Sequence, residues 1–252
     1  MTRLVSGVAL AAAALVAIRY LPPLPLRVLA CLVAALAAKE YLEMVDSPLR
    51  AVVLVVALCW VVSGTPVPSA LVLLTMALLW VGAEVLFSNH SIQQASTGIF
   101  SALYIGMPLG MLVAVHARLD WRATLLLIGT VAVSDSMQYY TGRLLGRRPL
   151  APTISPKKTI EGAIGGVVFG TLFLTMVGAR VLPFSGYGPL VILGLLVVTF
   201  GICGDLFESR LKRTAGMKDS SSLIPGHGGV LDRIDALLFA VAPFYLYVRN
   251  VT

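Results

Sequence analysis

Long apolar runs cover most of this sequence and exclude a water-soluble globular fold. Nine runs, separated by short polar or Pro- and Gly-containing stretches, lie near residues 4–20, 24–38, 50–65, 67–87, 97–117, 122–141, 160–182, 186–208 and 230–250. A helix of about 20 apolar residues crosses the hydrocarbon core of a bilayer, which is about 30 Å thick. We therefore expect an all-α, polytopic integral membrane protein with about nine transmembrane helices. Because the second and third runs are short, a count of about eight to ten is acceptable.

The basic residues indicate how the chain is oriented in the membrane. If nine spans alternate, 12 of the 19 Lys and Arg residues lie at the N-terminus and in the loops after the even-numbered spans; six lie on the opposite side, and Arg233 falls within the ninth run. Cytoplasmic loops carry the excess of Lys and Arg in membrane proteins. We therefore expect the N-terminus and two long polar loops, 142–159 and 209–229, on the cytoplasmic side of the cell (inner) membrane, with the C-terminus outside. The net charge of +7 follows from the same bias, so the expected partner is the lipid bilayer and not a nucleic acid.

The acidic residues are concentrated in the C-terminal half of the chain. Seven of the twelve lie between residues 135 and 235, whereas the first five runs contain few polar side chains besides Glu84 and His116. We therefore divide the chain into an N-terminal transmembrane scaffold, residues 1–95, and a catalytic transmembrane region, residues 96–252. The sequence suggests no partner for Glu84 or His116.

The segment 209–235 joins the last two apolar runs and contains cations, carboxylates, a histidine and glycines. Four polar residues around the beginning of this segment have the spacing of one helical face, and these are Asp205, Glu208, Ser209 and Lys212. Asp232 and Asp235 are three residues apart and share a face in the same way. Carboxylates at membrane depth are costly unless they pair, face water or hold a metal. These residues are therefore candidates for a functional site.

The residue types in this segment favour chemistry on phosphate groups. Mg²⁺ keeps several waters and binds one or two protein carboxylates together with substrate phosphates. Lys212, Arg213 and Lys218 would complement the phosphate charge. The stretch 225–229 has few Cβ atoms, so its backbone N–H groups could approach a phosphate chain closely. The pattern indicates metal-dependent phosphoryl or nucleotidyl transfer, and an ion transporter with acidic residues at membrane depth is the less favoured alternative.

The segment closely resembles the signature of the CTP:phosphatidate cytidylyltransferase (CDP-diacylglycerol synthase) family. The matching residues are Ser209, Leu211, Lys212, Arg213, Lys218, Asp219, Ser221, Ile224, Pro225, His227, Gly228, Gly229, Asp232, Arg233 and Asp235. An upstream block from Asp135 to Gly166 is similar to the family too, although Ser136 and Met137 depart from its pattern. In this block and just after it, Gly162, Gly166 and Gly170 recur every four residues, which predicts close packing against another helix. The resemblance covers roughly residues 95–252.

This resemblance implies a membrane enzyme, a phosphatidate cytidylyltransferase, that joins CTP and phosphatidic acid to give CDP-diacylglycerol and pyrophosphate. The implied cofactor is Mg²⁺, with a second cation such as K⁺, and its ligands would be Asp205, Asp232 and Asp135. The catalytic residues would be Asp235, Lys212, Arg213, Lys218, Asp219 and His227. The substrate-binding residues would be Ser155, Lys157, Lys158, Ser209, Gly228, Gly229 and Arg233.

The main alternative is a related CTP-dependent lipid enzyme, such as a polyprenol kinase or an archaeal-lipid cytidylyltransferase. Such an enzyme would use the same metal and triphosphate chemistry, but the complete signature disfavours it. The resemblance also suggests a homodimer.

Overall fold

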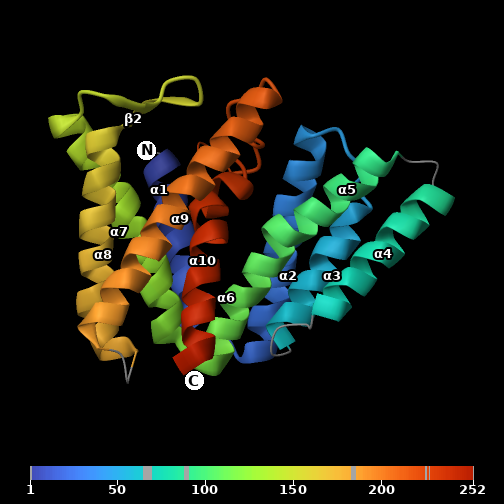
Figure 1. The fold of residues 1–252 in the computed structure, drawn as a ribbon, viewed down its shortest axis with the longest axis horizontal. Coiled ribbons are helices and arrows are strands. Elements are labelled where there is room, and N and C mark those ends of the chain that lie inside the picture. Colours follow the sequence, from blue (N-terminus) through green and yellow to red (C-terminus); the bar gives the residue numbers. More distant parts are fainter. Residues whose placement is uncertain are drawn as a thin grey trace. The chain divides into compact units, whose positions relative to one another are not determined.

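The computed structural model describes residues 2–64, 70–87, 91–182, 186–224, 226 and 228–251, and these residues are almost entirely helical (Figure 1). In chain order the elements are α1 (Thr2–Tyr20), α2 (Pro23–Met44), α3 (Ala51–Gly64), α4 (Ala70–Phe87), α5 (Ile92–Ser101), the π-helical turn η1 (Ala102–Gly106), α6 (Met107–Arg118), α7 (Trp121–Leu145), β1 (Pro149–Ala151), β2 (Ser155–Thr159), α8 (Ile160–Val181), α9 (Tyr187–Thr214) and α10 (Leu231–Val251). Because α5, η1 and α6 form one helical segment of 27 residues, the described parts of the chain contain one helical segment for each predicted apolar run.

Several of these helices are suited to a bilayer. Within the described residues, four segments are long and apolar enough to cross a membrane, and these are Ile92–Arg118, Ile160–Val181, Tyr187–Thr214 and Leu231–Val251. Gly7–Tyr20, Ala51–Gly64 and Leu73–Leu86 are shorter apolar helices. The all-α, multi-pass membrane class is therefore confirmed, whereas the exact number of crossings stays a prediction.

Polar residues determine where several helices begin and end. Ser91 and Gln94 form a reciprocal capping box at the start of α5, and Asp120 accepts backbone N–H groups at the start of α7. The Thr159 hydroxyl accepts the N–H of Gly162 at the start of α8. Such caps satisfy N–H groups that have no partner within the helix. At the C-terminal end of α9, Gly216 has φ +70, a left-handed conformation that ends the helix within segment 209–235, which we call the functional segment.

The chain forms two compact units, which are described separately here. The first unit contains Met1–Ala117 and Asp219–Arg233, and the second contains Arg118–Lys218 and Ile234–Thr252. The functional segment 209–235 therefore contributes residues to both units. The predicted division between residues 1–95 and 96–252 concerns function and stays a prediction.

In the first unit, α2, α3, α5 and η1 pack against one another. Glycine allows η1 and α3 to approach closely, because a Cβ at Gly106 of η1 would collide with the carbonyl oxygen of Val55 on α3. Aromatic rings fill the space between α2, α5 and η1: the centroids of Tyr41, Phe100 and Tyr104 lie 5.8 to 6.1 Å apart. This packing holds the C-terminal end of α2, which carries Glu40.

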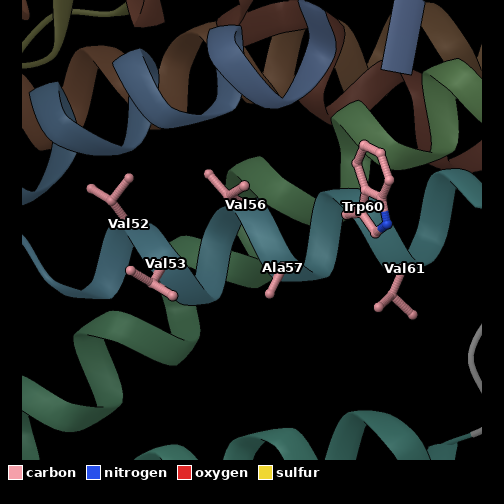
Figure 2. A pocket seen from close by; sticks show the side chains of 6 residues that line it. All are labelled: Val52, Val53, Val56, Ala57, Trp60 and Val61. Atoms are coloured by element: carbon pink, nitrogen blue, oxygen red, sulfur yellow. The ribbon is translucent and has the colours of Figure 1, made fainter. Parts of the chain in front are cut away.

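An apolar groove of about 460 Å³ runs along α3 in the first unit (Figure 2). Its lining consists of Val52, Val53, Val56, Ala57, Trp60 and Val61. None of these side chains carries a charge, so this groove offers no group that would bind a nucleotide or a phosphate. Its chemistry matches lipid tails, as expected for the surface of a membrane helix.

Glu84 has a partner that the sequence did not reveal. Its carboxylate on α4 lies 3.0 Å from Nε of Arg50, which precedes α3. The Glu84 side chain is 4% exposed, whereas that of Arg50 is 42% exposed. A buried carboxylate needs such a charge-assisted contact to offset its loss of hydration, so the pair has a structural role in the first unit.

Replacing Arg50 with glutamine is expected to lower the free energy of unfolding by about 2 kcal/mol, because Glu84 loses its ion pair while it stays buried. The measurement is the thermal unfolding midpoint in detergent. Lys39→Gln is the matched control, since Lys39 and Glu43 form an exposed pair 3.8 Å apart and its loss should cost about 0 to 0.5 kcal/mol. Equal losses in both variants would contradict a special contribution of the buried pair.

In the second unit, glycines of α8 allow α7 to pack closely. A Cβ at Gly162 would lie 2.7 Å from the carbonyl oxygen of Gln138, and one at Gly166 would lie 3.0 Å from that of Ser134. A side chain at Gly162 would collide with the backbone of α7, and one at Gly166 would collide with the Gln138 side chain of α7. The predicted close packing at the four-residue glycine spacing is therefore confirmed, and its partner is α7.

A short hairpin connects α7 to α8. Strand β1 pairs with β2 in antiparallel register, with Pro149 opposite Thr159 and Ala151 opposite Ser155. The Glu161 carboxylate accepts the backbone N–H groups of Arg147 and Arg148 at 3.0 and 3.3 Å. Glu161 thereby joins the beginning of the hairpin to the first turn of α8, and this fixes the strand that carries Ser155, Lys157 and Lys158.

Candidate active site

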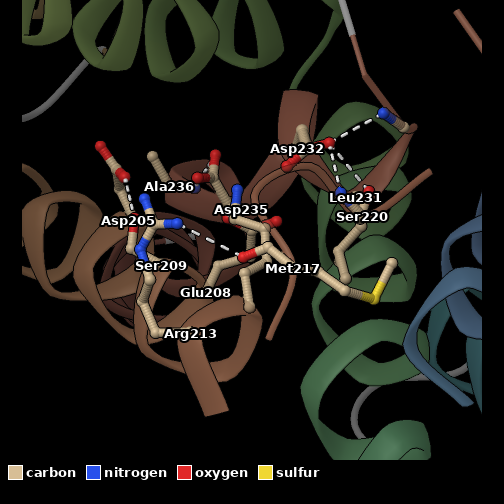
Figure 3. A network of polar contacts seen from close by, with 12 residues as sticks. Asp205, Glu208, Ser209, Arg213, Met217, Ser220, Leu231, Asp232, Asp235 and Ala236 are labelled. Carbon is tan, nitrogen blue, oxygen red and sulfur yellow. Dashed lines mark hydrogen bonds and ion pairs between the residues drawn. The ribbon is translucent and has the colours of Figure 1, made fainter. Parts of the chain in front are cut away.

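One face of α9 carries a series of polar side chains at its C-terminal end (Figure 3). The Ser209 hydroxyl donates to Oδ1 of Asp205 at 3.4 Å. One turn further, Lys212 forms an ion pair with Glu208, whose side chain is fully buried. The spacing read from the sequence therefore corresponds to contacts between neighbouring turns of a single helix.

Lys158 reaches Asp205 from the hairpin. Its ammonium group forms an ion pair with Oδ2 of Asp205, and both side chains are about a quarter exposed. The neighbouring Lys157 is exposed. Of the two consecutive lysines predicted to bind substrate, only Lys158 thus contacts the carboxylate of α9 in the described residues. The hairpin places a cation from residue 158 next to a carboxylate 47 residues later in the chain.

Two further carboxylates lie near Asp205 in the second unit. Asp205 lies close enough to Asp135 of α7 and to Asp235 of α10 for their negative charges to repel one another. Gly204 allows α10 to approach, because a Cβ there would lie 2.6 Å from the carbonyl oxygen of Asp235. Gln138 donates to Oδ1 of Asp135 at 3.0 Å. Three helices therefore bring together what we call the acidic cluster, Asp135, Asp205 and Asp235.

Two lysines balance part of the charge of the acidic cluster. The positive charge of Lys158 attracts Asp135 as well as Asp205, and the positive charge of Lys212 attracts Asp235. Because Lys212 also pairs with Glu208, the carboxylates here outnumber the ammonium groups, and this excess of negative charge favours the binding of a cation. The carboxylate oxygens of Asp205 and Asp135 and the hydroxyl oxygen of Ser209 are hard donors, which suit Mg²⁺ better than a soft metal.

These donors fit a cation that keeps part of its hydration shell. Within the ranges that the structure describes, no group of three or more His, Cys, Asp and Glu side chains is arranged to hold a metal ion. Mg²⁺ commonly takes only one or two protein carboxylates and completes its shell with waters and phosphates. The donor set around Asp205 is compatible with that mode of binding.

Asp232 lies in the first unit and organises the functional loop, residues 219–230 (Figure 3). Its Oδ2 accepts the N–H of Ser220 at 2.9 Å, the hydroxyl of Ser220 at 2.9 Å and the N–H of Gly229 at 2.8 Å. A metal bound to Asp232 would therefore have to use Oδ1. These bonds hold Ser220 and Gly229 of the loop against the first turn of α10.

The glycines of the functional loop have conformational and steric roles. Gly228 has φ +81, and its carbonyl oxygen accepts the N–H of Ile224 at 2.9 Å. A side chain at Gly229 would collide with the Ser220 hydroxyl and with the carboxylate of Glu40. Because the N–H of Gly229 donates to Asp232, this amide is already used within the protein.

Glu40 of α2 is a candidate site residue that the sequence did not reveal. Its side chain is buried, and its two oxygens accept hydrogen bonds from Ser220, Ser221, Val230 and Leu231. Glu40 follows an apolar run and resembles an ordinary charge at a membrane interface. It lies 180 residues from Ser220, so no local spacing could have connected the two.

The remaining predicted residues have weaker or undescribed contacts. Arg213 donates to the carbonyl oxygens of Ile154 and Met217, both at 3.4 Å. The exposed residues are Lys218, Asp219 and Arg233. Ser155 is half-buried on β2, and His227 lies outside the described residues.

The family match and the similar known proteins point to the same family. The cytidylyltransferase family matches residues 1–251. A phosphatidate cytidylyltransferase of Helicobacter pylori is 37% identical over 191 residues, which cover 74% of this chain and 68% of that protein. Proteins of the same name from Aquifex aeolicus and Bacillus subtilis are 46% and 39% identical over 122 and 151 residues, covering 48% and 59% of this chain. The matches span 45% and 55% of those two relatives, about half of their length. Because the family match extends over nearly the whole sequence, the chain belongs to the cytidylyltransferase family.

Proposed function

We propose that this chain is a phosphatidate cytidylyltransferase, which joins CTP and phosphatidic acid to give CDP-diacylglycerol and pyrophosphate. The observation that carries the proposal is the acidic cluster on three helices of a membrane protein, together with Lys158 of the hairpin and Lys212 of α9. Such a cluster can bind a cation and a polyphosphate next to a lipid. The names of the relatives supply the substrate class.

In this reaction an oxygen of the lipid phosphate monoester attacks the α-phosphorus of CTP. The new bond joins that oxygen to the α-phosphorus, and the bond from the α-phosphorus to the bridging oxygen of the β-phosphate breaks, so that pyrophosphate leaves. The second ionisation of a phosphate monoester lies near pH 6, so the nucleophile is largely a dianion at neutral pH. A strong general base is therefore unnecessary, and catalysis depends on positioning and charge stabilisation.

The basic residues of the second unit would hold the phosphate groups. Lys158 and Lys212 would neutralise the triphosphate and the leaving pyrophosphate, with Arg213 and Lys218 nearby in sequence. Ser155 and Lys157 on the hairpin, together with Ser209, would contact a phosphate group. The charged lysines stabilise the negative charge that moves to the leaving group in the transition state.

Mg²⁺ would be held by Asp205 and Asp135 of the second unit, with Asp235 close by. Asp232, the third ligand that the sequence predicts, belongs to the first unit and stays a prediction. When bound, Mg²⁺ supplies charge neutralisation and polarises the phosphoryl oxygens. Asp219 or Asp235 would orient a second cation such as K⁺. The functional loop, with Gly228, Gly229, Arg233 and His227, would contribute the remaining contacts to the nucleotide.

The orientation in the membrane follows from the charge distribution. The N-terminus, the hairpin and the functional loop would face the cytoplasm, where CTP is available, and the C-terminus would lie outside the inner membrane. A homodimer stays part of the proposal. Cysteine labelling from each side of the membrane tests the orientation.

The decisive test is incubation of the purified protein with CTP, phosphatidic acid and Mg²⁺, with the label placed either in the α- or in the γ-phosphate. We expect the α-label to enter the lipid and the γ-label to leave as pyrophosphate. Transfer of the γ-label to a polyprenol would instead show a kinase, and use of an archaeal lipid in place of phosphatidic acid would show the related cytidylyltransferase. Absence of any nucleotide chemistry would contradict the proposal.

A further inference from the structure

Glu40 lies within hydrogen-bonding distance of four donors, and all of them come from the functional loop or the start of α10. Oε2 accepts the Ser220 hydroxyl at 2.9 Å and the N–H of Leu231 at 2.8 Å. Oε1 accepts the Ser221 hydroxyl at 2.7 Å and the N–H of Val230 at 2.9 Å. The Glu40 side chain is 4% exposed, so these bonds replace nearly all of its hydration. All of these residues belong to the first unit.

This arrangement is favourable for both partners. A buried carboxylate is stable only when its oxygens accept hydrogen bonds. The first N–H groups of a helix have no partner within the helix, and the positive end of the helix dipole favours an anion there. The N–H groups of Val230 and Leu231 lie at the beginning of α10, so Glu40 satisfies them from a different helix.

Ser220 links Glu40 to Asp232. Its hydroxyl lies 2.9 Å from Oε2 of Glu40 and 2.9 Å from Oδ2 of Asp232, and its N–H also donates to Asp232. Because a hydroxyl carries one proton, the Ser220 hydroxyl donates either to Glu40 or to Asp232 at any one time. A displacement of Glu40 would therefore reach Asp232 through a single residue.

We infer that Glu40 is a positioning residue of the active site, which holds the functional loop and Asp232 in the geometry that binds the triphosphate of CTP. This inference rests on the proposed function, and it assigns a role in nucleotide binding to the N-terminal scaffold. Gly229 supports it, because a side chain there would occupy the space between Ser220 and Glu40. The loop is therefore packed directly against this carboxylate.

The test compares Glu40→Gln with Glu43→Gln in the full-length protein. Both replace a carboxylate of α2 by its amide, but the Glu43 side chain is exposed and forms an ion pair with Lys39 instead of contacting the functional loop in the described residues. In Glu40→Gln we expect about tenfold faster hydrogen exchange at the amides of Val230 and Leu231. We also expect a KM for CTP about tenfold higher and a kcat/KM about 10²-fold lower, because the phosphate-binding loop is misplaced. Glu43→Gln should match the parent protein.

The two readouts distinguish positioning from a merely structural role. If Glu40 only stabilised the fold, the variant would have less active enzyme with an unchanged KM for CTP, and that result would overturn the inference. Unchanged exchange at Val230 and Leu231 would overturn it as well. If the parent protein failed to transfer CMP, the proposed function would fail, whereas the exchange measurement would still test the contact of Glu40 with the loop.

A second variant keeps the test decisive if Glu40→Gln does not fold. Ser221→Ala removes a single hydrogen bond to Glu40 and should raise the KM for CTP about threefold. If both variants fold, the double variant Glu40→Gln/Ser221→Ala should behave like Glu40→Gln alone, because Ser221 then acts through Glu40. An unchanged KM in Ser221→Ala, or fully additive losses in the double variant, would contradict the inference.

Discussion

Replacing Asp205 with asparagine is expected to lower the turnover of CTP by about 10³-fold. Asparagine keeps the shape of the side chain but removes the charge that pairs with Lys158 and that would bind Mg²⁺. The measurement is the formation of CDP-diacylglycerol at saturating CTP and Mg²⁺. Size-exclusion chromatography and circular dichroism should show a folded protein, and Glu43→Gln on the exposed side of α2 is the charge-matched control.

A structural role of the Lys158–Asp205 pair predicts a different pattern. If the pair only stabilised the fold, removing both charges in Lys158→Met/Asp205→Asn would relieve the defect of Asp205→Asn. We expect the double variant to be as inactive as Asp205→Asn, because both residues would contact substrate phosphates or the cation. Full activity of Asp205→Asn would remove Asp205 from the proposed site.

Asp232 should be equally essential, and two substitutions separate its possible roles. In Asp232→Asn the amide oxygen can still accept the Ser220 and Gly229 donors that now bind Oδ2, while the negative charge is lost. In Asp232→Ala both the charge and these acceptors are lost. We expect a fall in kcat of about 10³-fold in both variants, with faster hydrogen exchange of the functional loop only in Asp232→Ala.

Activity in Asp232→Asn close to that of the parent protein would show that Asp232 only organises the loop. The assay is again the transfer of labelled CMP to phosphatidic acid, and the exchange of residues 219–230 provides the comparison that is independent of activity. Asp120→Asn is a suitable control, because Asp120 also accepts backbone N–H groups at the start of a helix but belongs to the cap of α7.

The helices could be predicted from the sequence because bilayer thickness sets the length of an apolar run. Their ends could not, since hydropathy detects the part of a helix that suits lipid and not the polar turns beyond it. Helix α9 continues to Thr214, past the apolar run that ends near residue 208, and α2 continues to Met44, past the run that ends near residue 38. Both extensions carry candidate functional residues, Lys212 on α9 and Glu40 on α2.

The local part of the candidate site was also predictable. Asp205, Ser209 and Lys212 share a face because a helix repeats every 3.6 residues. Contacts between distant segments leave no such signal. The ion pair of Lys158 with Asp205 depends on a hairpin, and that of Arg50 with Glu84 depends on the packing of two helices. The composition of the sequence identifies these residues as charged but does not identify their partners.

The first unit is built from two segments that are far apart in the chain, and this affects how the protein can be synthesised. This unit needs residues 219–233 as well as the chain up to Ala117. A ribosome releases the N-terminal part first, so Glu40 enters the membrane about 180 residues before the hydroxyls and amides that will satisfy it have been synthesised. The early helices must therefore be kept in an incomplete state during translation, and a nascent chain arrested before Asp219 would present an unsatisfied carboxylate to membrane quality control.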